Sequence, residues 1–188
     1  MPAPTALPIP RLHPFVGVDV PWLLGDRVAR RGDSPYIIWD PFEGEPRTWT
    51  YGEFGSAVAQ VAGGLWQRGI RPGEFVLIHL GNCPEFLIAF LAVTRIGALA
   101  LPFSTAYAPG ELRRGLRRND VHTLLIPTKL IGKDELAFVE EAVPELMTQS
   151  FANGRYAIPE LPHLRQVWVL GGTSDRSWAE AVDTAVDV

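Results

Sequence analysis

The sequence predicts an α/β fold in which a mostly parallel sheet is flanked by helices. Helix-like and strand-like segments alternate from residue 50 to residue 126, with short links between them. Parallel strands joined by right-handed crossovers are the usual result of such alternation. A second observation is the apolar run at 75–80, which is typical of a strand buried on both faces.

The composition of the 188-residue chain is 47% hydrophobic and 20% charged, as in soluble globular proteins. A net charge of −4 argues against a nucleic-acid partner. The single cysteine, Cys83, has no internal disulfide partner, so we expect a reducing compartment and a cytoplasmic location. The longest apolar run, 86–93, is too short to span a bilayer, and no signal peptide is evident.

The first elements follow a proline-rich start. Residues 1–20 read as an extended arm, because their prolines exclude a regular helix, and residues 21–188 as the folded domain. Pro21 suits the first turn of a helix that runs to about Arg31. Two short strands are expected next, at 36–39 and 47–49.

A capping box opens the second helix, because Thr50 and Glu53 can each bond the other's backbone N–H. Gly69 is placed to end this helix in a left-handed conformation. The strand at 75–80 comes next. The helix at 86–93 is apolar nearly all round, so we expect it to be deeply buried.

The remaining elements complete the alternation and then become less regular. A strand at 98–101, a helix at 111–118 and a strand at 121–126 come first. A helix at 133–141 and a loop at 144–163 follow.

Two expectations concern the end of the chain. The strand at 165–170 is the one we expect to be left with an exposed face. Ser177 and Glu180 repeat the capping-box pattern, which predicts a terminal helix running to Val188.

Several residues have a chemical and a structural interpretation. The Gly-Gly-Thr-Ser loop at 171–174 can cradle a phosphate or form an ordinary turn, and the turn is favoured because the lysine and spacing of a P-loop are missing. His79 in its apolar strand is better read as a hydrogen-bonded core residue than as a catalyst, and Cys83 as a packing residue. A cluster of arginines can meet nucleotide phosphates or form a solvated helix face, and the latter is favoured; it comprises Arg113, Arg114, Arg117 and Arg118.

Longer segments resemble a known family. Residues 49–54, Trp-Thr-Tyr-Gly-Glu-Phe, resemble the first core motif of the AMP-forming acyl-activating enzymes. Residues 61–76 resemble the family's "A-x-x-L-x-x-x-G-V-x-x-G-D-x-V" stretch, and residues 81–103 its "N-x-P-E-F…A-x-x-K-x-G-A-x-x-x-P" segment. The ordered series covers about 20 to 180 and is identified as the N-terminal segment of an AMP-forming acyl-CoA synthetase, most similar to the fatty-acyl or carnitine-type CoA ligases.

The resemblance implies an activity for the full-length family enzyme. Such an enzyme activates a carboxylic acid, here expected to be a fatty acid, with ATP and magnesium to an acyl-adenylate, and then transfers the acyl group to coenzyme A. The family's ATP loop ends in Pro-Lys-Gly, and neither Lys129 nor Lys133 has that setting. We therefore expect this chain to contribute no catalytic, cofactor-binding or metal residue, to stop shortly before the ATP loop and to be inactive alone.

A different class of function stays open beside this one. The chain could instead be a non-catalytic binding or interaction domain, or a degenerate remnant of such an enzyme, and self-association or a complementing chain is a possible partnership. Ligands of open α/β sheets bind at the carboxyl ends of the strands. The loop after the strand at 98–102 therefore supplies the candidate residues for a surface facing a substrate or partner, namely Ser104, Thr105 and Tyr107. In the alternative, this loop only packs against another part of the enzyme.

Overall fold

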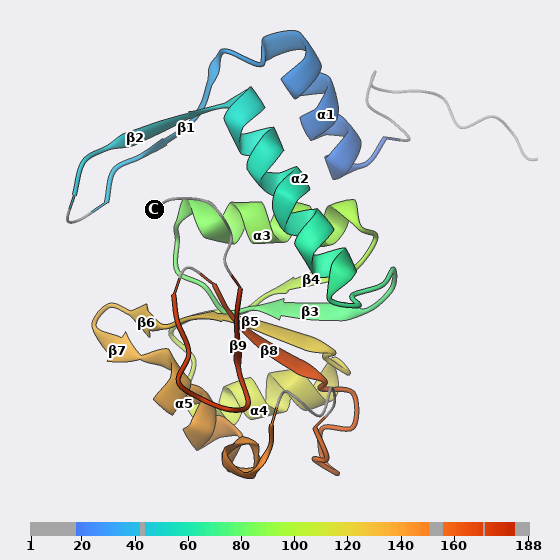
Figure 1. Cartoon of the computed structure of the whole chain (residues 1–188), viewed down its shortest axis with the longest axis vertical. Coiled ribbons are helices and arrows are strands. Elements are labelled where there is room, and N and C mark those ends of the chain that lie inside the picture. The colour runs from blue at the N-terminus through green and yellow to red at the C-terminus, as the bar shows by residue number, and fades with distance from the viewer. Residues whose placement is uncertain (1–17, 42–43, 151–155, 171, 183–188) are drawn as a thin grey trace, which may run out of the picture.

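The computed structural model describes residues 18–41, 44–150, 156–170 and 172–182. Figure 1 shows a sheet between two layers of helices. Helices α2 (Tyr51–Gln67) and α3 (Pro84–Arg95) cover one face, and α4 (Pro109–Arg118) and α5 (Glu135–Ala142) cover the other. The predicted α/β class with a parallel sheet and flanking helices is confirmed.

The central sheet has five parallel strands within the described residues, in the order β4-β3-β5-β8-β9. The chain turns back at β3, because β4 lies on one side of it and β5 on the other. This reversal sends α3 and α4 to opposite faces. The strands are β3 (Phe75–Ile78), β4 (Leu99–Pro102), β5 (Thr123–Pro127), β8 (Gln166–Leu170) and β9 (Glu180–Val182).

The core is divided by the sheet into two apolar clusters. Successive strand residues point to opposite faces. Ile78 and Leu125 therefore pack with α2 and α3, whereas Leu77 and Ile126 pack with α4 and α5. Both faces of the sheet are covered, as the continuous apolar strands predict.

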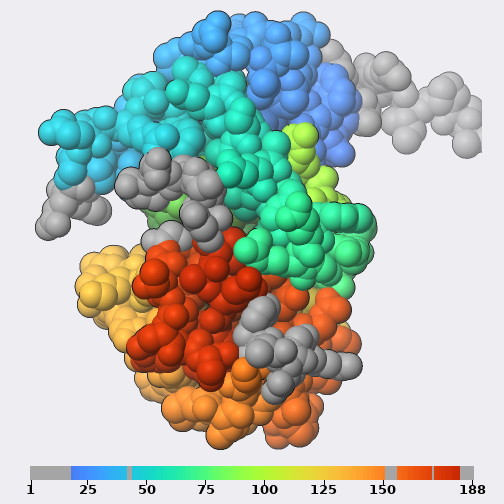
Figure 2. All heavy atoms as spheres, in the orientation of Figure 1, coloured from blue at the N-terminus to red at the C-terminus, as the bar shows by residue number. Residues whose placement is uncertain are grey.

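An additional layer precedes the sheet. It comprises α1 (Val20–Arg31) and an antiparallel hairpin of β1 (Pro35–Trp39) and β2 (Arg47–Thr50), and Figure 2 shows it as a lobe above the sheet. Val20, which the sequence assigned to the arm, begins α1; residues 1–17 of the predicted arm lie outside the described residues.

The predicted capping box at the start of α2 is present in full. The Glu53 N–H donates to Thr50 Oγ1 at 3.2 Å, and the Thr50 N–H donates to Glu53 Oε2 at 2.8 Å. Gly69 ends the turn after this helix with φ +93°, a left-handed conformation that glycine adopts at little cost.

Shorter elements connect the last strands. A small hairpin of β6 (Lys129–Leu130) and β7 (Lys133–Asp134) lies between β5 and α5, and the 3-10 helix η1 (Pro144–Thr148) follows α5.

The predicted terminal helix is wrong. Residues 180–182 form strand β9, and residues 183–188 lie outside the described residues. The side chain of Ser177 donates to the Gln149 carbonyl at 3.0 Å instead of capping a helix. Pairing with the free edge of β8 and burial of Trp178, which is 2% exposed, outweigh the local capping pattern.

The expected exposed face of the strand at 165–170 is also absent. Val167, Trp168 and Val169 are fully buried. Trp168 faces the α2–α3 cluster and its two neighbours face the α4–α5 cluster. The strand is interior because β5 pairs with one of its edges and β9 with the other.

Candidate functional site

The carboxyl ends of β3 and β4 lie side by side, with Ile78 in register with Pro102. The loop after β3 leads into α3, and the loop after β4 leads into α4. A surface cavity of about 340 Å³ opens between these loops. Its lining comes from both loops and the first turn of α3, and consists of Leu80, Gly81, Asn82, Phe86, Pro102, Phe103, Ser104 and Thr105.

Two of the three residues singled out in the sequence belong to this lining. Ser104 and Thr105 are exposed at the cavity, and the Ser104 hydroxyl accepts the Ala106 N–H at 3.2 Å. Tyr107 is exposed but lies outside the lining, with its ring packed edge-on against Phe103 at a centroid distance of 4.9 Å. Their role toward a substrate or partner stays a prediction.

The chemistry of the lining is that of binding. Its polar side chains are two hydroxyls and the Asn82 amide, and its apolar part is dominated by Phe86 and Phe103. Carboxylates and imidazoles, the usual groups for proton transfer, are absent from it. The cavity can therefore hold a ligand by hydrogen bonds and apolar contact.

A buried pair of titratable side chains lies behind the cavity. His79 follows β3 immediately before Leu80, and its Nε2 lies 3.1 Å from Glu135 Oε2 at the start of α5. His79 is 1% exposed and Glu135 is 4% exposed. Burial lowers the pKa of His79 and raises the pKa of Glu135.

The pairing explains His79 and reveals a residue that sequence analysis missed. His79 is the hydrogen-bonded core residue that its apolar strand predicts. Its partner is 56 positions away. Parallel pairing of β3 with β5 brings their carboxyl ends together, so the helix that follows β5 begins beside His79. A glutamate at a helix start is also an ordinary dipole partner, so nothing in the local sequence marks Glu135.

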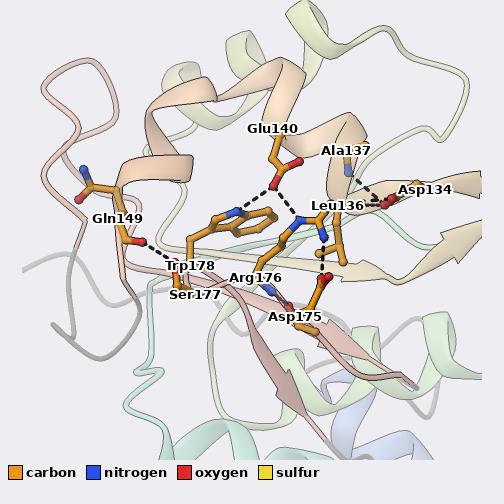
Figure 3. Close-up of polar contacts among 10 residues, drawn as sticks. Asp134, Leu136, Ala137, Glu140, Gln149, Asp175, Arg176, Ser177 and Trp178 are labelled. Atoms are coloured by element: carbon orange, nitrogen blue, oxygen red, sulfur yellow. Dashed lines mark hydrogen bonds and ion pairs between the residues drawn. The ribbon is translucent and has the colours of Figure 1, made fainter.

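Contacts drawn in Figure 3 hold α5 in place. The Asp134 carboxylate caps the helix by accepting the N–H groups of Leu136 at 2.9 Å and Ala137 at 3.1 Å. Glu140 Oε1 accepts Arg176 Nε at 2.8 Å and Trp178 Nε1 at 3.2 Å. With an ion pair between Arg176 Nη2 and Asp134 Oδ2 at 4.0 Å, these bonds link both α5 and its cap to the segment before β9.

Other candidates from the sequence have structural roles. Arg113 pairs with Glu145 on η1, whereas Arg117 and Arg118 are exposed, as a solvated helix face predicts. Burial raises the pKa of the Cys83 thiol to about 12, so it stays protonated at neutral pH. The loop after β8 is followed by a strand in place of the helix whose N-terminus would favour a phosphate.

The described part of the chain contains neither a metal-ligand cluster nor a membrane-spanning helix. There, no group of three or more His, Cys, Asp or Glu side chains is arranged to hold a metal ion. Among the helices described, none has the length and apolar character needed to cross a membrane.

A family model described as "AMP-binding enzyme" matches residues 24–177. The chain belongs to this family. The resemblance carried by residues 49–54 and by the two longer segments is therefore confirmed.

The similar curated proteins are CoA ligases. Crotonobetaine/carnitine–CoA ligase of Salmonella typhi is 29% identical over 110 residues, which is 58% of this chain and 21% of the relative. The Salmonella typhimurium enzyme is 32% identical over 110 residues, with the same coverage of 58% and 21%. The chain thus spans 21% of the length of the curated relatives that it matches.

Solved structures share the fold. Acetoacetyl-CoA synthetase from Streptomyces lividans matches 86% of this chain and 24% of its own, with a TM-score of 0.68 and 22% identity. The anthranilate CoA ligase AuaEII matches 85% of this chain and 26% of its own, with a TM-score of 0.65 and 19% identity. The N-terminal subdomain of Klebsiella oxytoca NpsA matches 56% of this chain and 27% of its own, with a TM-score of 0.52 and 24% identity.

Proposed function

We propose that this chain forms the N-terminal part of an acid–thiol ligase. In the reaction, a carboxylate oxygen attacks the α-phosphorus of ATP and pyrophosphate leaves; the thiol of coenzyme A then attacks the acyl carbon, loses its proton and displaces AMP. The observation that supports this function is the match of residues 24–177 to the AMP-binding enzyme family, together with relatives named CoA ligases. A cytoplasmic location is part of the proposal, because a chain whose single cysteine, Cys83, has no internal disulfide partner suits a reducing compartment.

The cavity between the β3 and β4 loops is proposed as the surface of this chain that faces substrate. It lies at the carboxyl edge of a parallel sheet, beside the strand where the chain reverses direction. Its apolar lining favours an aliphatic chain of the fatty-acid type, and Ser104, Thr105 and Asn82 offer hydrogen bonds to a polar part of the same molecule. Tyr107 supports this surface through its contact with Phe103.

The chemical steps themselves are assigned to groups outside these residues. The sequence contains no Ser/Thr/Gly-rich loop ending in Pro-Lys-Gly, and its two lysines, Lys129 and Lys133, lie in the exposed hairpin β6–β7. Positioning and cation clamps carry most of the catalysis in reactions at phosphorus. We therefore expect the chain alone to form no adenylate, with ATP, magnesium and coenzyme A engaged only by the complete enzyme.

Two measurements on the 188-residue chain test the proposal. Pyrophosphate exchange with a panel of fatty, short-chain and aromatic acids should stay at the no-protein control. Turnover above that control would refute the inactivity. NMR with decanoate should shift the amide signals of Phe86, Ser104 and Thr105; Thr105→Trp should abolish the shifts and Thr173→Trp, on another exposed loop, should keep them.

The outcomes separate the two classes of function. Binding of acids at the cavity without turnover supports a substrate-facing part of a ligase. Shifts with no preference for carboxylic acids over alcohols of equal length would favour a non-catalytic binding domain. An absence of shifts around Ser104 and Thr105 would overturn the assignment of the cavity.

A further inference from the structure

We propose that His79 and Glu135 are positioning residues of the cavity: their hydrogen bond keeps the ring of Phe103 in the cavity lining, and uptake of a further proton by the pair releases it. The pair would regulate the shape of the cavity, and only the identity of the ligand rests on the proposed function. A buried proton is thereby coupled to the position of one aromatic side chain.

The geometry links the pair directly to the lining. The His79 ring is stacked on Phe138, with centroids 5.2 Å apart and an interplanar angle of 4°. The His79 ring also contacts that of Phe103, with centroids 6.1 Å apart and an interplanar angle of 53°. Both distances lie in the range of favourable aromatic contacts. The backbone is fixed as well, since the His79 N–H donates to the Leu125 carbonyl at 2.9 Å. Movement of the imidazole therefore requires movement of a neighbouring phenyl ring.

The proton count makes this site sensitive to acid. A neutral imidazole can donate its one N–H, at Nε2, to the Glu135 carboxylate, and Nδ1 then carries no proton. His79 Nδ1 is buried without a hydrogen-bond partner among the described residues. One further proton forms either an imidazolium beside the carboxylate, or a carboxylic acid that donates to Nε2 while the imidazole N–H moves to Nδ1. Both forms place an N–H at the buried Nδ1, where it has no hydrogen-bond partner among the described residues. A buried N–H group without a partner is unfavourable.

The charged groups that face the pair come from the hairpin and the helix cap. The pKa of Glu135 is raised by burial first; Lys133 acts in the opposite direction and Asp134 in the same direction. Burial lowers the pKa of His79, and Glu135 is its only charged contact within the described residues. The ammonium of Lys133 and the carboxylate of Asp134 act in opposite directions, and burial is the largest influence on the pKa of Glu135.

The two phenyl neighbours differ in how firmly they are held. Phe138 belongs to α5, which is fixed by the Asp134 cap and by the contacts of Arg176 and Trp178 with Glu140 (Figure 3). Phe103 lies in the loop after the edge strand β4 and is half-buried. The Phe103 side is therefore the direction in which we expect a protonated His79 ring to gain access to water.

The free direction for Phe103 is the cavity. On the other side its Cε2 atom lies only 2.7 Å from the place where a Cβ on Gly115 would stand, so the ring lies close against α4. Tyr107 closes another side at 4.9 Å. Displacement of Phe103 by the protonated pair would thus alter the cavity lining itself.

The test follows Phe103 without any substrate. The whole chain is labelled with 4-fluorophenylalanine, the Phe103 signal is assigned with Phe103→Leu, and the fluorine shift is recorded from about pH 8 to about pH 5, around the usual histidine pKa. We expect a titration step whose midpoint coincides with that of the His79 imidazole carbon signal. A flat Phe103 signal, or a midpoint that matches another group, would overturn the proposal.

Variants distinguish a titrating pair from a merely structural one. Glu135→Gln keeps the size and a hydrogen bond but removes one ionisation, so it should move the Phe103 midpoint by about one pH unit or remove the step. His122 immediately precedes β5, at the amino ends of the strands and so at the opposite end of the sheet from the cavity. His122→Gln should therefore leave the step in place. An unchanged Phe103 midpoint in Glu135→Gln would overturn the proposal. If that variant does not fold, the comparison of the Phe103 and His79 midpoints in the unaltered chain still tests the proposal. Failure here leaves the ligase assignment standing, because no acid or nucleotide is used.

Discussion

Arg113 and Glu145 join α4 to η1 through a two-pronged ion pair, with Nη1 2.8 Å from Oε2 and Nη2 2.7 Å from Oε1. The same guanidinium donates to the Ala142 carbonyl at 3.3 Å, at the end of α5. One side chain thus ties together three elements on the same face of the sheet. The hydrogen bonds from Arg113 lower the pKa of Glu145 to about 2.

The first prediction concerns the strength of this pair. A double-mutant cycle of Arg113→Ala and Glu145→Ala should give a coupling of about 0.5–1 kcal/mol, because both side chains are partly exposed and solvent screens them. The pKa of Glu145 is depressed in the fold, so the coupling should be present above the carboxyl's ordinary pKa of 4.5 and be lost as the pH falls toward 2. Urea unfolding measures it.

The control for this cycle is the pair of Arg114 and Glu111 on the same helix. Its atoms are 3.9 Å apart and both side chains are more exposed. We expect a coupling close to zero. Equal couplings for the two pairs would contradict the importance of two-pronged geometry.

A second prediction concerns the close approach of Phe103 to α4. Gly115→Ala gains about 1 kcal/mol of helix propensity but forces Cβ against the ring, which costs about 1–3 kcal/mol, so the net effect should be destabilising. In a Phe103→Leu background the same change should stabilise. Gly63→Ala, in α2 with open space around its Cβ position, should stabilise alone. Denaturant midpoints compare the three, and equal gains at both glycines would rule out the steric account.

The turn of the β6–β7 hairpin carries a third prediction. Ile131 has φ +49° and Gly132 has φ +75°, the left-handed pair of a type I′ turn, in which a β-branched residue is strained. The Ile131 side chain is 93% exposed, so little contact would be lost by replacing it. Ile131→Asn should therefore stabilise the chain by about 1 kcal/mol. A decrease in melting temperature would show instead that Ile131 contributes packing.

The fourth prediction concerns the pH dependence of stability produced by His122, which lies at the amino ends of the strands, immediately before β5. The Phe75 N–H donates to His122 Nδ1 at 3.3 Å. Burial lowers the pKa of His122; Glu74 and Asp120 raise it, and Arg165 and His163 lower it further. A base whose folded pKa is depressed contributes stability above its unfolded pKa of 6.5 that is lost as the pH falls through the folded value. His122→Gln should flatten the pH dependence of the unfolding free energy in this range.

The control for this prediction is His163→Gln. The His163 ring lies 5.6 Å from that of His122 and is itself exposed, so its removal should change the pH dependence little. A pH dependence that survives His122→Gln unchanged would show that other groups produce it.

Self-association is the last prediction. Strand β4 is at an edge of the sheet and its Leu99 is 45% exposed; Trp22 and Ile38 add further exposed apolar surface. Unpaired edges with apolar side chains favour association. Sedimentation should reveal concentration-dependent oligomers with binding of an apolar dye. Leu99→Lys should reduce both, and Met147→Lys, an exposed position on η1, should not. A monodisperse monomer with little dye binding would favour a self-sufficient domain.

Local sequence determined most of the elements and the family. The capping pair of Thr50 and Glu53, the glycine at 69 and the alternating apolar segments each act over a few residues, so their structures can be predicted from nearby positions alone. The motifs at 49–54 and 81–103 identify the AMP-binding family for the same reason: they are contiguous. The carboxyl-edge location of Ser104 also followed from the order of strand and helix.

The tertiary structure decided what depends on distant partners. Ser177 and Glu180 carry a helix-start pattern, yet residues 180–182 pair with β8, because an open sheet edge offers backbone hydrogen bonds and Trp178 gains burial there. Glu135 meets His79 only because β5 lies beside β3 in the sheet. Such contacts join residues far apart in the chain, and their free energy exceeds the local preferences that sequence patterns express.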